Sequence, residues 1–159
     1  MEISSDTLRK KIEELVQKYE EIKPKIRKSP HYPNEQDTVT KFIRPMLEAF
    51  GWDFLDPEEV KEELPFEGGQ HIDCVLYLNG NPHIVIECKH LGLSALTHKN
   101  EYKQRRERAK RFGVNIFVYT NFAETIIHRF NEEELHYFEN PAEYLRKLDT
   151  LKQCLLKTT

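Results

Sequence analysis

Two acidic residues stand where apolar, strand-forming segments of the sequence would otherwise be uninterrupted. Asp73 lies at the start of one segment, and Glu87 closes another that reads Ile84-Val85-Ile86. Lys89 follows Glu87 by two residues, a spacing that places two side chains on the same side of a strand, roughly 6.6 Å apart. Cys88, between them, would point to the opposite side, into the core. The pattern indicates two carboxylates and one ammonium group at the end of a sheet.

The sequence Asn79-Gly80 between the two segments favours a tight hairpin turn, which would place Asp73 beside Glu87. Two carboxylates about 5 Å apart repel each other by about 3 kcal/mol at an effective dielectric constant of about 20. A fold can hold them together if a cation lies between them or if one of them takes up a proton. Because Mg²⁺ prefers carboxylates, waters and phosphate oxygens, the pair predicts a Mg²⁺ site in which Mn²⁺ can substitute.

Lys89 adds a reactive role to this predicted metal site. Its ammonium group could hold a phosphate oxygen or orient an attacking water. A metal ion meets the other needs of phosphodiester hydrolysis, because it makes a bound water more acidic and neutralises charge on the phosphate. The three side chains together therefore predict metal-assisted hydrolysis of a phosphodiester.

The elements that would position these residues are those of an α/β domain with a mixed sheet. Segments of β-branched and aromatic residues predict strands at 58–66, 72–78, 84–88, 114–119 and 125–130. Apolar residues at helical spacing predict helices at 5–24, 34–51 and 91–112 and from 140 onward. Asn34 is the expected N-cap of the second helix, with Asp37 completing a capping box, and Pro45 should kink or loosen that helix.

The charge of the chain is segregated along the sequence. The chain has 159 residues, enough for one domain, and a net charge of −3, which argues against a globally basic nucleic-acid binder. From 99 to 111, however, there are seven basic residues against two acidic ones, whereas from 53 to 67 there are seven acidic residues against one lysine. The basic run could contact phosphates through Gln104, Arg108 and Arg111, which fall on one side of a helix, with Arg105 and Arg106 as further candidates, or it could be a solvated helix face.

Other features of the sequence indicate the cellular compartment of the protein and the type of metal that it could bind. The three cysteines lack Cys-x-x-Cys spacing, which argues against a thiolate zinc site and suits a reducing environment. No apolar stretch approaches the roughly 18 residues of a membrane span, and the first residues lack the pattern of a secretory signal. We therefore expect a cytoplasmic protein that does not bind membranes. His71 and His90 flank the acidic residues, but nitrogen ligands suit zinc and softer metals better than Mg²⁺.

The spacing of the charged residues resembles a known nuclease signature. Asp73, thirteen further residues and then Glu87-Cys88-Lys89 match the PD-(D/E)xK pattern, although His71-Ile72 stands where that pattern has its proline. The resemblance covers about Asn34 to Asn121. Its other parts are the segments 34–38, 42–47 and 50–53, Gln104 with Arg108, and the segments 113–114 and 120–121. In these parts the chain resembles the N-terminal nuclease domain of type I restriction-enzyme R subunits and of fused type II restriction–modification enzymes.

This resemblance implies a restriction-endonuclease-like fold and a Mg²⁺-dependent endodeoxyribonuclease that leaves a 5′-phosphate and a 3′-hydroxyl. It implies functional roles for six residues, namely Asp73, Glu87, Cys88, Lys89, Glu35 and Gln104. Asp73, Glu87 and the backbone carbonyl of Cys88 would bind the metal, and Glu35 would approach the same metal from a helix. Lys89 would be the catalytic lysine. Gln104 would lie near the site and contact the DNA backbone or the water network.

The resemblance also implies partners and a domain organisation. The chain would be a single nuclease domain over 1–159, with a core at about 34–130, an N-terminal helix and linker at 1–33 and a C-terminal helix at 141–157. It would act on double-stranded DNA together with methyltransferase, specificity or helicase domains or subunits of a restriction system. Two alternatives stay open: a stand-alone DNA repair or phage-defence nuclease of the same fold, and a catalytically inactive nuclease-fold module that binds DNA or a protein.

Overall fold

The computed structural model describes residues 3–28, 33–92 and 99–158. The strands of this part of the chain lie side by side in chain order: β1 (Val60–Phe66), β2 (Gln70–Leu78), β3 (Asn81–Cys88), β4 (Ile116–Thr120), β5 (Thr125–Arg129) and β6 (Glu134–Phe138). In this sheet β3 and β4 are parallel, whereas the other neighbouring strands are antiparallel. The sheet is therefore mixed, as the sequence predicts.

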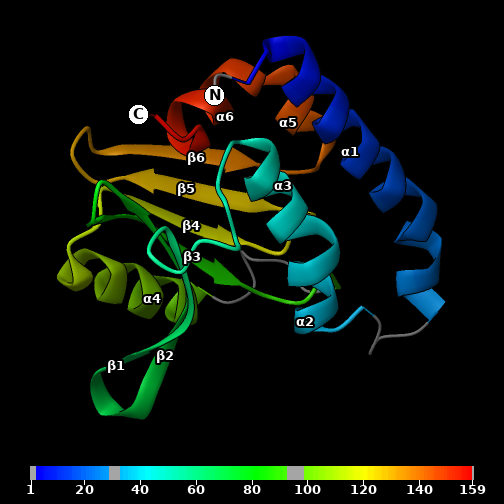
Figure 1. Ribbon diagram of the computed structural model, residues 1–159. Coiled ribbons are helices and arrows are strands. Elements are labelled where there is room, and N and C mark those ends of the chain that lie inside the picture. The colour runs from blue at the N-terminus through cyan, green and yellow to red at the C-terminus, as the bar shows by residue number, and fades with distance from the viewer. Residues whose placement is uncertain (1–2, 29–32, 93–98, 159) are drawn as a thin grey trace.

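Helices cover both faces of this sheet (Figure 1). The described helices are α1 (Ser5–Lys28), α2 (Glu35–Thr38), α3 (Arg44–Ala49), α4 (Lys99–Phe112), α5 (Ala142–Arg146) and α6 (Leu148–Leu155). α4 connects β3 to the parallel β4 and packs on one face, where Ala109 is buried with Phe117. α1, α3 and α6 share the core on the other face, where Leu8, Leu47 and Leu151 are buried. The predicted α/β fold, with a mixed sheet flanked by helices, is confirmed.

A tight turn at Asn79 and Gly80 joins β2 to β3. Both residues have positive φ angles, 52° and 80° respectively, as a type I′ hairpin turn requires. The antiparallel pairing then places Cys74 opposite Ile86, so that the next residues along the two strands are the acidic pair that the sequence singles out. The hairpin expected from the sequence is present and brings two segments of the chain together by a purely local connection.

The segment that covers the site begins at the predicted capping box. The Asp37 N–H donates to Asn34 Oδ1 over 2.8 Å, and the Asn34 N–H donates to Asp37 Oδ2 over 3.3 Å. These two hydrogen bonds satisfy backbone groups that the first helical turn would leave without partners. The segment ends, as predicted, at Gly51, whose φ of 102° favours glycine.

Pro45 loosens the middle of the same segment, as predicted. Residues Val39–Ile43 form a wider π-helical turn between α2 and α3. Pro45 has no N–H with which to reach the carbonyl of Lys41. That carbonyl instead accepts a hydrogen bond from Lys18 Nζ over 2.9 Å, which links α1 to this segment.

Two of the predicted helices have different ends in the structure. α1 continues through Pro24 to Lys28 instead of ending at Pro24. Pro24 and Glu20 are both exposed, so the carbonyl that loses its partner at this point can bond to water. The helix expected from residue 91 is represented in the described residues by α4, which begins at Lys99. Leu91 and Gly92 form a turn. Residues 93–98 of that prediction lie outside the described part of the chain.

The C-terminal third also differs from the prediction. β6 has no counterpart among the predicted strands, because it is an outer strand in which Phe138 alone is buried and the apolar pattern is weak. The helix expected after Pro141 is divided into α5 and α6, since the backbone leaves helical geometry at Lys147, with φ −112° and ψ 35°. Each helix in the described residues is too short or too polar to cross a membrane.

Candidate active site

The structure brings Asp73 and Glu87 together at one end of the β2–β3 hairpin. The Cys88 N–H donates to Asp73 Oδ2 over 2.7 Å, a hydrogen bond that fixes the aspartate at the end of β3. Glu87 is almost completely buried, with 1% of its side chain exposed. Its Oε2 accepts from Arg105, whereas its Oε1 has no hydrogen-bond partner within the described residues. A buried carboxylate oxygen without a partner is costly unless a proton or a cation satisfies it.

The electrostatics of Glu87 follow from this position. Burial, and after it the negative charge of Asp73, raises the pKa of Glu87 to about 8, although the Arg105 guanidinium opposes the shift. Desolvation disfavours the charged form of a carboxyl group, and a second carboxylate nearby disfavours it further. The pair therefore needs either a proton or additional positive charge, as expected from the sequence.

Two residues of α4 form an ion-pair network with the site. Arg105 pairs with Glu87 and, over 3.0 Å from its Nη2, with Glu101 Oε1. Glu101 also pairs with Lys89. From the sequence, Arg105 was a candidate phosphate contact and Glu101 had no assigned role, and neither was expected to pair with the acidic residues or Lys89. Their spacing of i and i+4 on a helix that follows the motif strand is the signal that could have found them.

Lys89 and Cys88 point in opposite directions, as the alternation of a strand predicts. The Lys89 N–H donates to the carbonyl of Thr120 over 2.9 Å, which fixes the end of β3 against β4. Its side chain reaches α4, on the same side as Glu87. The Cys88 side chain is buried on the other side of the sheet, and burial raises the pKa of its thiol. A thiol in that state is a poor nucleophile.

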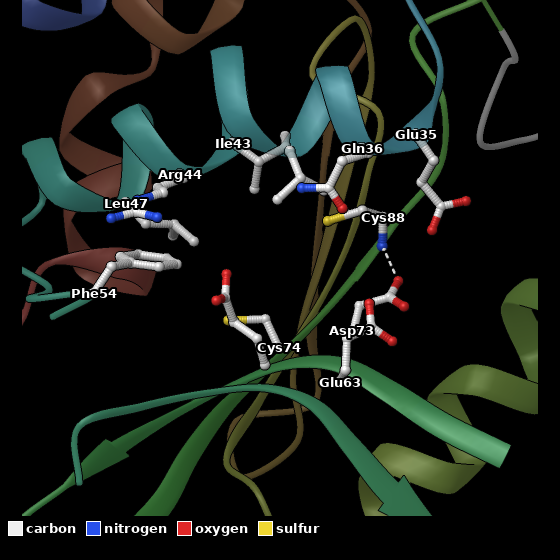
Figure 2. Close-up of a pocket in the computed structure, with 12 residues that line it drawn as sticks. Glu35, Gln36, Ile43, Arg44, Leu47, Phe54, Glu63, Asp73, Cys74 and Cys88 are labelled. Atoms are coloured by element: carbon white, nitrogen blue, oxygen red, sulfur yellow. Dashed lines mark hydrogen bonds between the residues drawn. The ribbon is translucent and has the colours of Figure 1, made fainter. Parts of the chain in front are cut away.

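A pocket of about 330 Å³ lies between α2–α3 and the β1–β2 strands, with Asp73 at one end (Figure 2). Glu35, the first residue of α2, points toward Asp73 from the rim. Burial by the pocket walls, and then the charge of Asp73, raises the pKa of Glu35. The opposite end is less acidic: the Arg44 guanidinium lies 5.2 Å from the centre of the Phe54 ring.

Glu63 contributes another carboxylate to the acidic end of this pocket, and the sequence does not predict it. The β1–β2 pairing runs from Glu62 opposite Cys74 to Leu64 opposite Ile72, so Glu63 faces Asp73 across the strands. Its φ of 51° lies in the left-handed region, which is unfavourable for a residue with a side chain. The irregularity turns its carboxylate into the pocket beside Asp73 (Figure 2).

The other residues singled out by the sequence lie outside this group. Gln104 is on the exposed side of α4, one position before Arg105. The His71 ring is near the backbone, with Nδ1 3.4 Å from the Glu63 carbonyl, and His90 Nδ1 accepts from the Gly92 N–H over 3.2 Å. These contacts do not place either histidine ring beside the acidic pair as a further metal ligand.

The donor atoms fit a hard divalent cation that takes part of its ligands from solvent and substrate. Asp73 and Glu87 offer two neighbouring carboxylates, and Glu87 Oε1 is buried without a partner in the described residues. No group of three or more His, Cys, Asp or Glu side chains is arranged to hold a metal in the described part of the chain. Mg²⁺ commonly binds proteins through one or two carboxylates and keeps several waters.

The sequence matches the family described as type I restriction enzyme R protein N terminus over residues 62–144, more than half of the chain. The chain belongs to this family. The matched region of this R-protein N-terminal domain extends from β1 into α5 and contains Asp73, Glu87 and Lys89, whereas Glu35 precedes it.

One solved structure supports the fold of the R-protein N-terminal domain. It is a fragment of a protein described as an HsdR subunit of a type I restriction enzyme from Vibrio vulnificus YJ016. The two structures share 21% sequence identity and a TM-score of 0.54, and the match covers 74% of this chain. It covers 25% of the other chain, so the matched part of the present chain spans a quarter of that fragment. None of the curated protein sequences matches at a significant level.

The orientation of α4 in this R-protein N-terminal domain corrects one prediction. Arg108 was expected to face solvent and phosphates together with Gln104 and Arg111, but it is 7% exposed. Its guanidinium donates to the His71 carbonyl over 3.2 Å and to the Gln70 side chain. Arg108 therefore ties α4 to β2 and is not available to DNA. It lies inward because it shares a helix face with the two α4 residues of the ion-pair network.

We expect Arg108→Ala to lower the free energy of unfolding by about 2 kcal/mol, because the His71 carbonyl and the Gln70 side chain lose a charged donor. Urea denaturation measures the change. Arg111→Ala is the matched control, since Arg111 is exposed and lies 3.7 Å from an exposed Glu67. That variant should change stability by less than about 0.5 kcal/mol. Equal effects of the two substitutions would contradict the structural role of Arg108.

Proposed function

We propose that this domain is the nuclease module of a type I restriction enzyme and that it hydrolyses phosphodiester bonds of double-stranded DNA with Mg²⁺. The observation that carries the proposal is the unpartnered Oε1 of the buried Glu87, beside a second carboxylate on Asp73 and an ammonium group on Lys89. Such an arrangement suits a cation and a phosphate better than it suits a structural ion pair. Membership of the R-protein family supports the restriction-system setting.

The residues of the chain would have distinct roles in this reaction. Asp73, Glu87 and the backbone carbonyl of Cys88 would hold the ion, and Glu35 would approach it from the pocket rim. A bound divalent cation supplies an acidified water and neutralises charge on the phosphate. Lys89 would hold a phosphate oxygen or orient the attacking water, which requires its ammonium group to leave Glu101.

The exposed side of α4 is the proposed contact surface for the DNA backbone. Lys103, Gln104, Lys110 and Arg111 are exposed there. Contacts from such side chains to phosphates would bind duplex DNA without preference for sequence. The other subunits of the restriction system would select the DNA sequence and control when the DNA is cut.

Metal binding tests the proposal directly. Isothermal titration of the chain with Mg²⁺ should show saturable binding for which Ca²⁺ competes, because both ions are hard and bind carboxylate oxygens. A nuclease-fold module that only binds DNA or a protein would show no such competition. The family match favours the restriction-system role over a stand-alone repair or defence nuclease. Absence of divalent-metal binding in the folded chain would overturn the proposal.

The proposed DNA surface makes a further prediction. We expect the Lys103→Gln, Lys110→Gln double variant to flatten the slope of log affinity against log salt concentration by about two, because each neutralised phosphate contributes about −0.9. The loss should be equal for all duplex sequences. Fluorescence anisotropy with labelled duplexes measures both properties.

The matched control for this experiment is the Lys10→Gln, Lys11→Gln double variant. It removes the same charge from exposed positions on α1 and should leave the slope unchanged. An unchanged slope in the α4 double variant would remove these lysines from the DNA surface. A loss confined to one DNA sequence would mean that α4 reads bases.

A further inference from the structure

Arg105 is the cationic residue that pairs directly with Glu87 of the acidic pair in this structure. It reaches from the second turn of α4 and binds Glu87 Oε2 with one guanidinium nitrogen and Glu101 Oε1 with another. Its side chain is 21% exposed, so most of the guanidinium is removed from water. Burial alone would lower its pKa, but the charges of Glu87 and Asp73 raise it. The protein thus supplies Glu87 with one positive charge of its own.

The same network also engages Lys89. The chain of ion pairs runs from Glu87 to Arg105, then to Glu101 and then to Lys89. It contains two negative and two positive groups, so these four side chains balance one another. In this arrangement one oxygen of Glu87 is bound to a guanidinium, and the ammonium group of Lys89 is bound to a carboxylate. Oε2 of Glu87 and the Lys89 ammonium group are thus both engaged, whereas Glu87 Oε1 has no partner within the described residues.

A guanidinium that binds a carboxylate in this way is equally suited to phosphate. Arginine presents a planar set of N–H donors that matches the oxygens of carboxylates and phosphates alike. Glu101 lies one helical turn before Arg105 and bonds a different nitrogen from the one that Glu87 bonds. Glu101 can therefore retain Arg105 within the site when its bond to Glu87 is broken.

We propose that Arg105 is the resident counter-ion of Glu87 in the metal-free domain and a phosphate-binding residue in the metal-loaded one. Its guanidinium leaves Glu87 when a divalent cation binds and then pairs with the oxygens of the DNA phosphate at the site. This inference rests on the proposed function. It adds that the metal ion and Arg105 compete for the carboxylate of Glu87. Binding of the metal ion and release of Arg105 for phosphate binding therefore occur together.

Arg105→Gln tests the competition, with metal affinity as the readout. We expect the variant to bind Mg²⁺ about tenfold more tightly than the unaltered chain in the absence of DNA, since a competing cation is removed. Isothermal titration at pH 9 measures this affinity. Arg106→Gln is the matched control: it removes the same charge one position away, where the guanidinium lies 5.6 Å from the centre of the Tyr102 ring. Its Mg²⁺ affinity should not change.

The second measurement is of DNA affinity, which should change in the opposite direction to metal affinity. In Ca²⁺, Arg105→Gln should bind duplex DNA about tenfold more weakly than the unaltered chain, because the phosphate ligand is missing. Arg105→Lys keeps the positive charge but lacks the planar set of N–H donors, so it should give intermediate values in both experiments. The lysine variant also provides the test if the glutamine variant fails to fold. An arginine that only fixes α4 to the sheet would produce no gain in metal affinity in either variant.

The outcomes separate this inference from the proposed function. If the unaltered chain binds Mg²⁺ through Asp73 but neither Arg105 variant binds it more tightly, the counter-ion role is overturned and the metal site stands. If duplex affinity in Ca²⁺ is unchanged in both variants, the phosphate-binding role is overturned. If the unaltered chain itself binds no divalent cation, both the inference and the proposed function fail.

Discussion

We expect Asp73→Asn to lose DNA cleavage by at least about a thousandfold while the domain stays folded. The amide has nearly the shape of the carboxylate and retains an oxygen that can accept from the Cys88 N–H, but it lacks the charge that holds a divalent cation. Alanine would be a poorer choice, because the buried N–H of Cys88 would lose its acceptor, which costs about 1–3 kcal/mol. Nicking of supercoiled plasmid in the presence of Mn²⁺ measures the activity.

The control for this experiment is Asp149→Asn, the same chemical change at an exposed position on α6. Circular dichroism and a thermal melt establish that both variants are folded. The control should cut at the rate of the unaltered chain. If Asp73→Asn also cut at that rate, Asp73 would not belong to the active site.

The second large effect is expected at Lys89. We expect Lys89→Ala to keep Mg²⁺ binding and to lose turnover by about 10²–10³-fold, because the lysine acts on the phosphate or the water and not on the ion. Titration with Mg²⁺ and plasmid nicking, carried out on the same preparation, separate the two properties. Lys25→Ala, at an exposed position of α1, should change neither.

A different result would assign Lys89 another role. If Lys89→Ala lost metal binding to the same extent as Asp73→Asn, the lysine would be organising the carboxylates. The ion pair from Lys89 to Glu101 makes that outcome a specific possibility to test, since Glu101 also contacts Arg105.

The acidic pair was predictable because its residues interrupt segments that are otherwise apolar. An acid among β-branched residues signals a special position, and the Asn79-Gly80 turn specifies which two strands meet. The same reasoning predicted the mixed sheet and the capping box at Asn34. Catalytic roles for Asp73, Glu87, Lys89, Glu35 and Gln104 stay predictions until the variants are measured.

The partners of the acidic pair on α4 were not predictable in the same way. The apolar stripe of this helix, Tyr102, Ala109 and Phe112, packs against the sheet as its spacing predicts, but it does not show which of the charged residues beside it turn inward. Tertiary packing turns Arg105 and Arg108 inward and leaves Gln104 outward. The position of Glu63 was equally hidden, because it depends on a left-handed backbone conformation that the sequence does not reveal.

The irregular backbone of β1 has a consequence for assembly. β1 lies at the border of the described sheet and pairs on one side with β2, and unpaired strand borders attract strands of other chains. Pro65 lacks an N–H, Glu63 bends the strand, and Lys61 presents a charged side chain, so this border is a poor template for further strand addition. The pocket beside Asp73, which Glu62 and Glu63 of β1 help to line, is thereby protected from being covered by a strand of another chain.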